Sequence, residues 1–172
     1  MNNPETRAGT LDALQVYAGR VMSATSDQEV FQAAEQAAQH AIGHQLFTIM
    51  IFDPDRMEVE RCFSNRQSEY PTGGRKKKRD TEWGRHVLMQ GNVYIGSNED
   101  DIRWAFNDHD IITGMGLCAV LNIPIKRMGR VIGTMNLLDD HPHYDEADAN
   151  VGGIIAIGLS SNLSVQGQKS GA

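Results

Sequence analysis

Two apolar runs that flank a short basic turn are the clearest feature of the hydrophobic pattern, between Leu117 and Leu138. The turn, residues 126–130, contains a glycine near its end, so the segment predicts an antiparallel β-hairpin. Side chains alternate across a strand, which assigns one wholly apolar face to Leu117, Ala119, Leu121, Ile123, Val131, Gly133, Met135 and Leu137. The polar side chains of the opposite face are Cys118, Asn122, Thr134 and Asn136.

The two asparagines of this hairpin predict a polar cavity. Burying an amide without a hydrogen-bond partner costs about 1–3 kcal/mol, so a strand face that carries two amides needs polar surroundings. We therefore expect a hydrophilic pocket over the face that holds Asn122 and Asn136.

Apolar residues at helical spacing predict three helices, over 11–24, 26–42 and 146–163. Ser26 followed by Glu29 has the form of a capping box at the start of the second helix. Three glycines work against the third helix, because each costs about 1 kcal/mol relative to alanine: Gly152, Gly153 and Gly158.

Three further strands are predicted, at 46–52, 57–63 and 93–95. Antiparallel strands between helices at the two ends of the chain favour an α+β layer fold. The helices would cover the apolar face of the sheet, and the two long connections, 64–92 and 96–116, would close over the polar face. Within these connections we expect a short helix over 83–90 and one helical turn around 101–106.

Length and composition fit one domain with a substantial core. The chain has 172 residues, of which 40% are hydrophobic and 22% are charged. We expect a disordered lead over 1–10, a single domain over 11–163 and a flexible tail over 164–172.

Charge and cysteine content restrict the compartment and the partners. No apolar run approaches the roughly 20 residues that span a bilayer, and the first residues lack the apolar core of a secretory signal. Two cysteines do not form a disulfide framework, which favours the reducing cytoplasm. The net charge of −6 makes nucleic acid an unlikely partner.

The basic run Arg75–Arg79 is a local exception to the acidic composition. It could clamp an anionic ligand or a phosphate backbone. We favour a solvated loop, because no aromatic residue interrupts the run and loop-forming residues flank it.

Three segments together resemble the GAF domain family: 120–125, 129–137 and 144–148. They match a small apolar strand that ends in proline, a Gly-x-Val-Ile-Gly-x-x-x-Leu strand and the entry to a closing helix. The resemblance spans about residues 11–163. It implies a five- to six-stranded antiparallel sheet with helices on one face and pocket-forming loops on the other.

The resemblance also implies ligands and an assembly. GAF domains bind cyclic nucleotides, bilins, haem or small metabolites, so the cofactor stays unknown. Many of them dimerise through terminal helices, which implies a homodimer through residues 11–24 and 146–163.

The predicted ligand site combines aromatic and polar residues of the connections with the polar hairpin face. Its members are Trp83, His86, Tyr94, Trp104, Phe106, His109, Met115, Cys118, Asn122, Thr134 and Asn136. In an alternative, Trp83 and Trp104 plug the polar face. Both tryptophans should be substantially buried in either case.

An enzyme is the main alternative function. Free methionine-R-sulfoxide reductases are stand-alone GAF domains that use a cysteine nucleophile and a resolving thiol. Their cysteines lie in the connections that close the pocket, whereas Cys62 and Cys118 lie on predicted strands. The cysteine positions therefore disfavour this enzyme.

Other ligands have weaker support. A bilin would need an exposed cysteine, and Cys118 on a strand is more typical of a small hydrophobic residue. A cyclic nucleotide could use helix amides near Thr81 or Asp101, although three acids, 99–101, oppose an anion at the second place. We expect no metal, because the histidines and acids of 139–146 match no closed tetrahedral site and fit a turn before a capped helix.

We therefore predict a non-catalytic sensory or regulatory domain that binds a small molecule and signals through a partner. The rival function is a ligand-free dimerisation module whose pocket its own side chains fill.

Overall fold

The predicted hairpin forms the centre of the sheet. The structure is a computed structural model that describes residues 4–78 and 81–163. Its elements follow in the order α1 (Pro4–Ser23), α2 (Asp27–Ala41), β1 (Leu46–Asp53), β2 (Glu58–Ser64), β3 (Arg75–Lys77), the π-helix η1 (Gly84–Met89), β4 (Tyr94–Gly96), α3 (Glu99–Ala105), α4 (His109–Gly114), β5 (Ala119–Arg127), β6 (Arg130–Asp139) and α5 (Glu146–Leu159).

The strand order across the sheet is β3-β2-β1-β6-β5-β4, and all the pairs are antiparallel. The hairpin is β5–β6, with β1 beside β6. Asn136 pairs with Asn122 on one side and with Thr48 on the other, so their side chains share one face in a row. The predicted α+β class with an antiparallel sheet is confirmed, with six strands.

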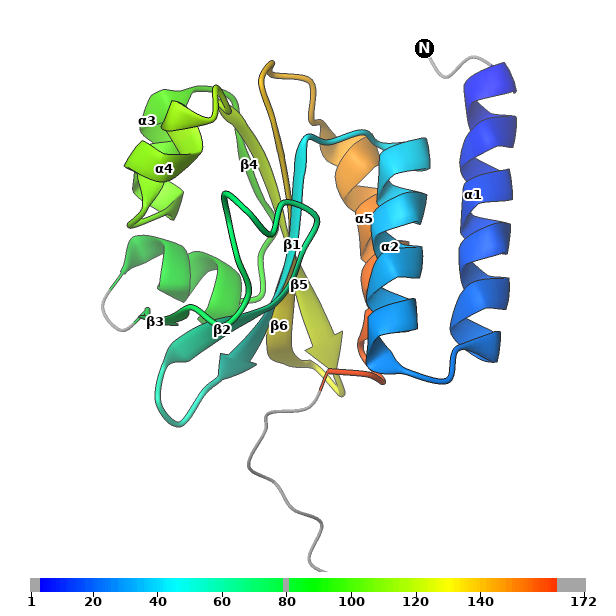
Figure 1. The fold of residues 1–172 in the computed structure, drawn as a ribbon, viewed down its shortest axis with the longest axis horizontal. Coiled ribbons are helices and arrows are strands. Elements are labelled where there is room, and N and C mark those ends of the chain that lie inside the picture. The colour runs from blue at the N-terminus through cyan, green and yellow to red at the C-terminus, as the bar shows by residue number, and fades with distance from the viewer. Residues whose placement is uncertain (1–3, 79–80, 164–172) are drawn as a thin grey trace, which may run out of the picture.

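Helices cover both faces of this sheet. Figure 1 shows α2 and α5 against one face, with α1 outside α2, and the segments that contain α3 and α4 on the other side. The core under α2 and α5 is apolar and includes Phe47, Ile49, Leu121, Met135 and Leu137. A second buried core lies beneath the connections and includes Leu46, Met50, Phe52, Val87 and Ile102.

Close packing explains two of the glycines in α5. A Cβ atom at Gly152 would overlap the side chain of Ile123 in β5, and one at Gly158 would overlap the ring of Tyr17 in α1. The Tyr17 hydroxyl also donates a hydrogen bond of 2.7 Å to the carbonyl oxygen of Ile155. These contacts offset the cost of glycine in a helix, so the third predicted helix forms as α5.

The register of the hairpin corrects two residues of the predicted apolar face. Leu117 precedes β5 and lies in the core beneath the connections. A β-bulge after Ile125 makes Val131 pack against that core, whereas Ile132 packs against the core under the helices. The bulge adds one residue to β6, and strict alternation is lost there.

The boundaries of several elements differ from the prediction. Helix α1 begins at Pro4, so residues 4–10 are helical where the sequence predicted a disordered lead. The short helix expected over 83–90 is the π-helix, and the irregular stretch 98–116 holds α3 and α4. The predicted tail, 164–172, lies outside the described residues. No helix in the described ranges has both the length and the apolar character needed to cross a bilayer.

Candidate functional site

A chain of buried hydrogen bonds runs across the face beneath the connections. The Trp83 indole donates to Oδ1 of Asn122 at 2.9 Å, and Nδ2 of Asn122 donates to Oδ1 of Asn136 at 2.8 Å. Nδ2 of Asn136 then donates to the Thr48 hydroxyl oxygen at 3.1 Å. All four side chains are buried, so these bonds offset the desolvation of both amides.

Trp83 covers this polar face in the structure. Its side chain is 2% exposed and belongs to the core beneath the connections. Two cavities in the described chain lie elsewhere, one between α1 and α2 and one between α5, β5 and residues 91–93. The ligand pocket over the polar face therefore stays a prediction, and Trp83 is the group that a ligand there would displace.

Three predicted site residues form an aromatic group at the edge strand β4. The ring centroids of Tyr94 and Trp104 are 4.6 Å apart, and the His86 ring lies 6.4 and 6.3 Å from them. The Trp104 indole donates to Glu82 at 2.8 Å, and this tryptophan is 38% exposed. The expected burial of Trp104 is therefore wrong, because the residue lies at the β4 edge of the sheet, where the order of the described strands ends.

The other predicted site residues occupy different places. Phe106 is buried and Met115 packs against the same core, beneath the connections. His109 on α4 lies 3.0 Å from the carboxylate of its neighbour Asp110. The Thr134 hydroxyl is buried without a hydrogen-bond partner.

Neither cysteine is placed as a reactive thiolate. Cys62 donates a hydrogen bond to the carbonyl oxygen of Ile49, and burial raises the pKa of its thiol to about 12. Cys118 donates to the carbonyl oxygen of Asp140 at 3.2 Å, and burial with the nearby Asp140 charge raises its pKa. A nucleophilic cysteine needs the opposite shift.

A buried charged group that the sequence did not predict lies on the same sheet face, at β2 and β3. We call it the cationic cluster, and its members are Arg61, Tyr70, Lys76, Lys78 and Asp108. Arg61 pairs with Met50, which pairs in turn with Thr134. Paired residues of antiparallel strands share a face, so Arg61 and the unpartnered Thr134 hydroxyl belong to the same side of the sheet.

Asp108 supplies the carboxylate of the cationic cluster. Its Oδ2 atom accepts hydrogen bonds from the Tyr70 hydroxyl, at 2.7 Å, and from the Lys76 ammonium. The same oxygen lies 3.8 Å from Nη2 of Arg61, whose Cζ atom is 3.5 Å from the centroid of the Tyr70 ring. Three polar atoms remain buried without a hydrogen-bond partner: Nε and Nη2 of Arg61 and Oδ1 of Asp108.

The charges of the cationic cluster do not balance. Lys78 is 4% exposed, its ammonium lies 4.7 Å from the Trp83 ring centroid, and burial followed by the Lys76 charge lowers its pKa to about 8. Burial alone would raise the pKa of Asp108, but the hydrogen bond and charge of Lys76 hold it below its ordinary value. Three basic side chains, those of Arg61, Lys76 and Lys78, therefore share the cationic cluster with one carboxylate.

The sequence contained one signal for the cationic cluster, and strand pairing in the structure adds a second. Val59 and Arg61 lie two positions apart on a strand predicted to be half-buried, so the arginine shares the buried face. Lys76 pairs with Val59, which turns Lys76 to that face too. The solvated loop predicted for 75–79 is therefore wrong for Lys76, which is partly buried, and for Lys78; Arg79 lies outside the described residues.

Ligand types for a metal ion meet after β6. Asp139, Asp140 and His141 bring one donor atom each within 4.8 Å of the others. Each also has a partner within the protein: His141 lies 2.8 Å from Asp140, and His143 lies 3.0 Å from Asp139. These pairs order the turn before α5, whose first residues Asp145 caps.

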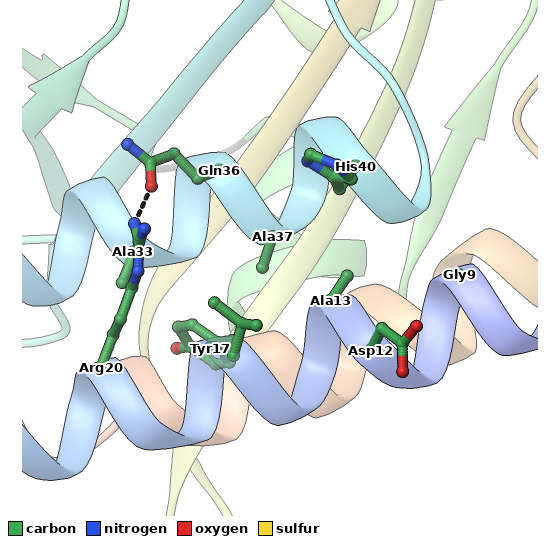
Figure 2. Close-up of a pocket in the computed structure, with 10 residues that line it drawn as sticks. Gly9, Asp12, Ala13, Tyr17, Arg20, Ala33, Gln36, Ala37 and His40 are labelled. Carbon is green, nitrogen blue, oxygen red and sulfur yellow. Dashed lines mark hydrogen bonds between the residues drawn. The ribbon is translucent and has the colours of Figure 1, made fainter.

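The larger of these two cavities is a cleft of about 460 Å³ between α1 and α2. Figure 2 shows Ala13 and Tyr17 of α1 facing Ala37 of α2, with Arg20 hydrogen-bonded to Gln36 at one end. Most of its lining side chains are apolar, and they come from the outer helix α1 and the inner helix α2. None of the predicted site residues lies in this cleft.

Comparison with protein families gives a match that covers most of the chain. A model of the GAF domain matches residues 24–164, which include every element from α2 to α5. The chain belongs to the GAF domain family. Helix α1 precedes the matched segment, and a search of curated proteins finds no match.

Solved structures share the fold at low sequence identity. The GAF domain of an Acinetobacter phosphoenolpyruvate-protein phosphotransferase aligns with a TM-score of 0.72 and 15% identity, over 95% of this chain and 94% of that one. Free methionine-R-sulfoxide reductase from Neisseria meningitidis aligns at 0.68 and 18%, over 95% and 92%. The chromophore-binding domain of Stigmatella aurantiaca phytochrome P1 aligns at 0.68 and 16%, over 91% and 60%.

Proposed function

We propose that this GAF domain is a cytoplasmic regulatory module that binds a small molecule and signals through a partner without catalysing a reaction. The ligand would occupy the sheet face beneath the connections. The observation that carries the proposal is the buried polar row of that face, formed by Thr48, Asn122 and Asn136 with Thr134 beside it. Apolar side chains would fill a purely structural core at a lower desolvation cost.

The proposed signal passes from the connections to the helices. A ligand that displaces Trp83 would close the segments 64–92 and 96–116 around itself and alter the outer surface of the domain. That surface carries exposed apolar side chains on α1 and α5: Leu11, Val16, Met22, Ile154 and Ile157. Exposed apolar side chains of this kind favour a homodimer through these helices.

A reductase of the methionine sulfoxide type is a second candidate, since such an enzyme shares this fold. Burial raises the pKa of the Cys62 thiol to about 12, and the pKa of Cys118 is raised as well. Both shifts oppose formation of a thiolate nucleophile. An assay for reduction of free methionine sulfoxide, with a Cys118→Ser variant, distinguishes this enzyme from the proposed module.

Native mass spectrometry of the purified protein, with thermal shifts for a panel of nucleotides, tetrapyrroles, amino acids and organic acids, tests the binding function. Thr134→Val removes a buried hydroxyl that has no partner, so it should leave stability within about 0.5 kcal/mol while reducing the ligand-induced shift. A protein that retains no molecule and responds to none of the panel would be the ligand-free module instead.

Light scattering tests the proposed dimer. Ile157 is 70% exposed on α5, and Ile157→Glu should convert a dimer to a monomer. Met128 is 99% exposed at the β5–β6 turn, so Met128→Glu is a control of the same chemistry and should leave the mass unchanged. A monomeric wild-type protein would remove the dimer from the proposal.

A further inference from the structure

We propose that the ligand carries a carboxylate or phosphate group, which Arg61, Lys76 and Lys78 bind at the place now held by the carboxylate of Asp108. This inference rests on the proposed function and names the chemical class of its ligand. Asp108 would act as an internal substitute for the ligand and keep the empty site closed.

The excess of buried positive charge is the first argument. Arg61 and Lys78 are 5% and 4% exposed, and burial of an unbalanced cation opposes folding. Asp108 balances one of the three cations. A doubly charged anion that takes the place of the Asp108 carboxylate would balance one more of them and raise the lowered pKa of Lys78, so its binding would recover part of the cost of burial.

Unused donors are the second argument. Nε and Nη2 of Arg61 are buried without hydrogen-bond partners, and a guanidinium binds carboxylates and phosphates best through two parallel N–H donors. Thr134, whose hydroxyl is also unpartnered, lies two strands away from Arg61. By strand spacing, the backbones of these two residues are roughly 10 Å apart. A ligand bound at its anionic end by Arg61 could thus reach Thr134 and the covered amides.

The placement of Asp108 is the third argument. Ser26, Asn98 and Asp145 each precede a helix and accept a hydrogen bond from a backbone amide of its first turn. Asp108 precedes α4 and makes no such bond. Its carboxylate joins Tyr70 and Lys76 instead, so the segment that begins α4 is bound to the cationic cluster through a contact that a competing anion can replace.

Lys78 connects the cationic cluster to the polar row. Its ammonium lies over the ring of Trp83, and the indole of Trp83 donates to Asn122. An anion that draws the Lys78 ammonium toward itself would remove one of the contacts that hold the ring over the amides. Anion binding and exposure of the polar face are therefore coupled in this proposal.

Calorimetric titration with inorganic phosphate and with succinate, at constant ionic strength set by chloride, tests the inference. Lys76→Met should weaken binding of whichever anion binds by at least tenfold. Lys77→Met is the matched control, because Lys77 is the next residue of the same strand and is exposed, so it should bind as the wild type does.

Asp108→Asn removes the internal competitor and should strengthen anion binding at least tenfold. Asp110→Asn is its control, since the Asp110 side chain is 94% exposed. If Asp108→Asn does not fold, the comparison of Lys76→Met with Lys77→Met still tests the inference. Equal affinity in the two lysine variants, or no heat with either anion, would overturn the inference. If native mass spectra show a retained neutral molecule whose binding Lys76→Met does not change, the proposed function holds but the inference of an anionic ligand is wrong.

Discussion

The two faces of the sheet are both buried, but different chemistry buries them. Under α2 and α5, the strands present apolar side chains such as Phe47, Leu121 and Leu137, and helix packing covers them. Beneath the connections, the same strands present amides and hydroxyls, and β2 and β3 add Arg61 and Lys76.

The difference indicates a division of work between the faces. Burial of apolar area stabilises the fold at about 25 cal/mol per Å², and the side chains that the strands present to α2 and α5 contribute in this way. The opposite face buries polar and charged groups at a cost, and leaves Thr134, Arg61 and Asp108 with unpartnered atoms. Groups kept in place at such a cost are typical of sites that bind a ligand.

A deletion on the helical face should give the largest loss of stability. Leu137 is fully buried there, so Leu137→Ala should lower the free energy of unfolding by about 2–5 kcal/mol through lost transfer energy and a cavity. Urea unfolding measures this change. A loss below 1 kcal/mol would show that the helical face contributes less than its packing indicates.

A deletion in the polar row should cost less. Asn122→Ala leaves the Trp83 indole and the Asn136 carbonyl oxygen without partners, at about 2–3 kcal/mol in total. Urea unfolding followed by tryptophan fluorescence reports both the loss of stability and the change around the indole. A neutral substitution would mean that water replaces the amide without cost, as it would in a wet pocket.

Lys78→Met should raise the free energy of unfolding instead of lowering it. Methionine removes a buried charge and keeps the volume, so the variant should be more stable than the wild type by about 1–3 kcal/mol at pH 7. The pKa of Lys78 is about 8 in the folded protein and 10.5 as its ordinary value, so the unfolded chain binds more protons between these two pH values.

The stability of the wild type relative to Lys78→Met should therefore rise as the pH increases from 8 to 10.5. Paired urea titrations over this range measure the difference, and groups common to both proteins cancel. A difference that stays constant with pH would show that Lys78 is not buried as a cation.

The smallest effect is expected for a polar contact between two helices, α1 and α5. Tyr17→Phe removes the hydrogen bond to the carbonyl oxygen of Ile155 and should cost about 1 kcal/mol. Hydrogen exchange in α1 should increase in parallel, because this contact fixes α1 against α5. Unchanged exchange would indicate that the contacts of α1 with α2 suffice.

Most of the fold was predictable from the sequence because the decisive signals are local, whereas β3 lies in a segment predicted to be a loop. About 20 residues or fewer are enough to predict each of three elements: the hairpin at 117–138, the capped second helix and the alternating strand at 57–63. The β-bulge does not, since it depends on how β5 pairs with β6, and it exchanged the faces of Val131 and Ile132.

The candidate site was only partly predictable. Asn122, Thr134 and Asn136 follow from alternation, and Trp83 is the one aromatic residue of the predicted set that donates to their amides. The cationic cluster escaped prediction because Asp108 lies 47 positions from Arg61, so their contact depends on the path of the connections. The basic run also shows no alternation of apolar and polar residues. Only the pairing of β3 with β2 turns Lys76 toward the buried face.

The indole N–H signals of the two tryptophans provide the most direct test of the account. Trp83 covers the polar row and Trp104 lies exposed on the edge of the same layer, so one spectrum contains both the probe and its control. In ¹H–¹⁵N spectra, a molecule that stabilises the protein against heat should shift or broaden the Trp83 indole signal more strongly than that of Trp104, which lies in a segment that closes around the ligand but does not cover the polar row. Thermal stabilisation with an unmoved Trp83 signal would contradict a ligand site on this face of the sheet.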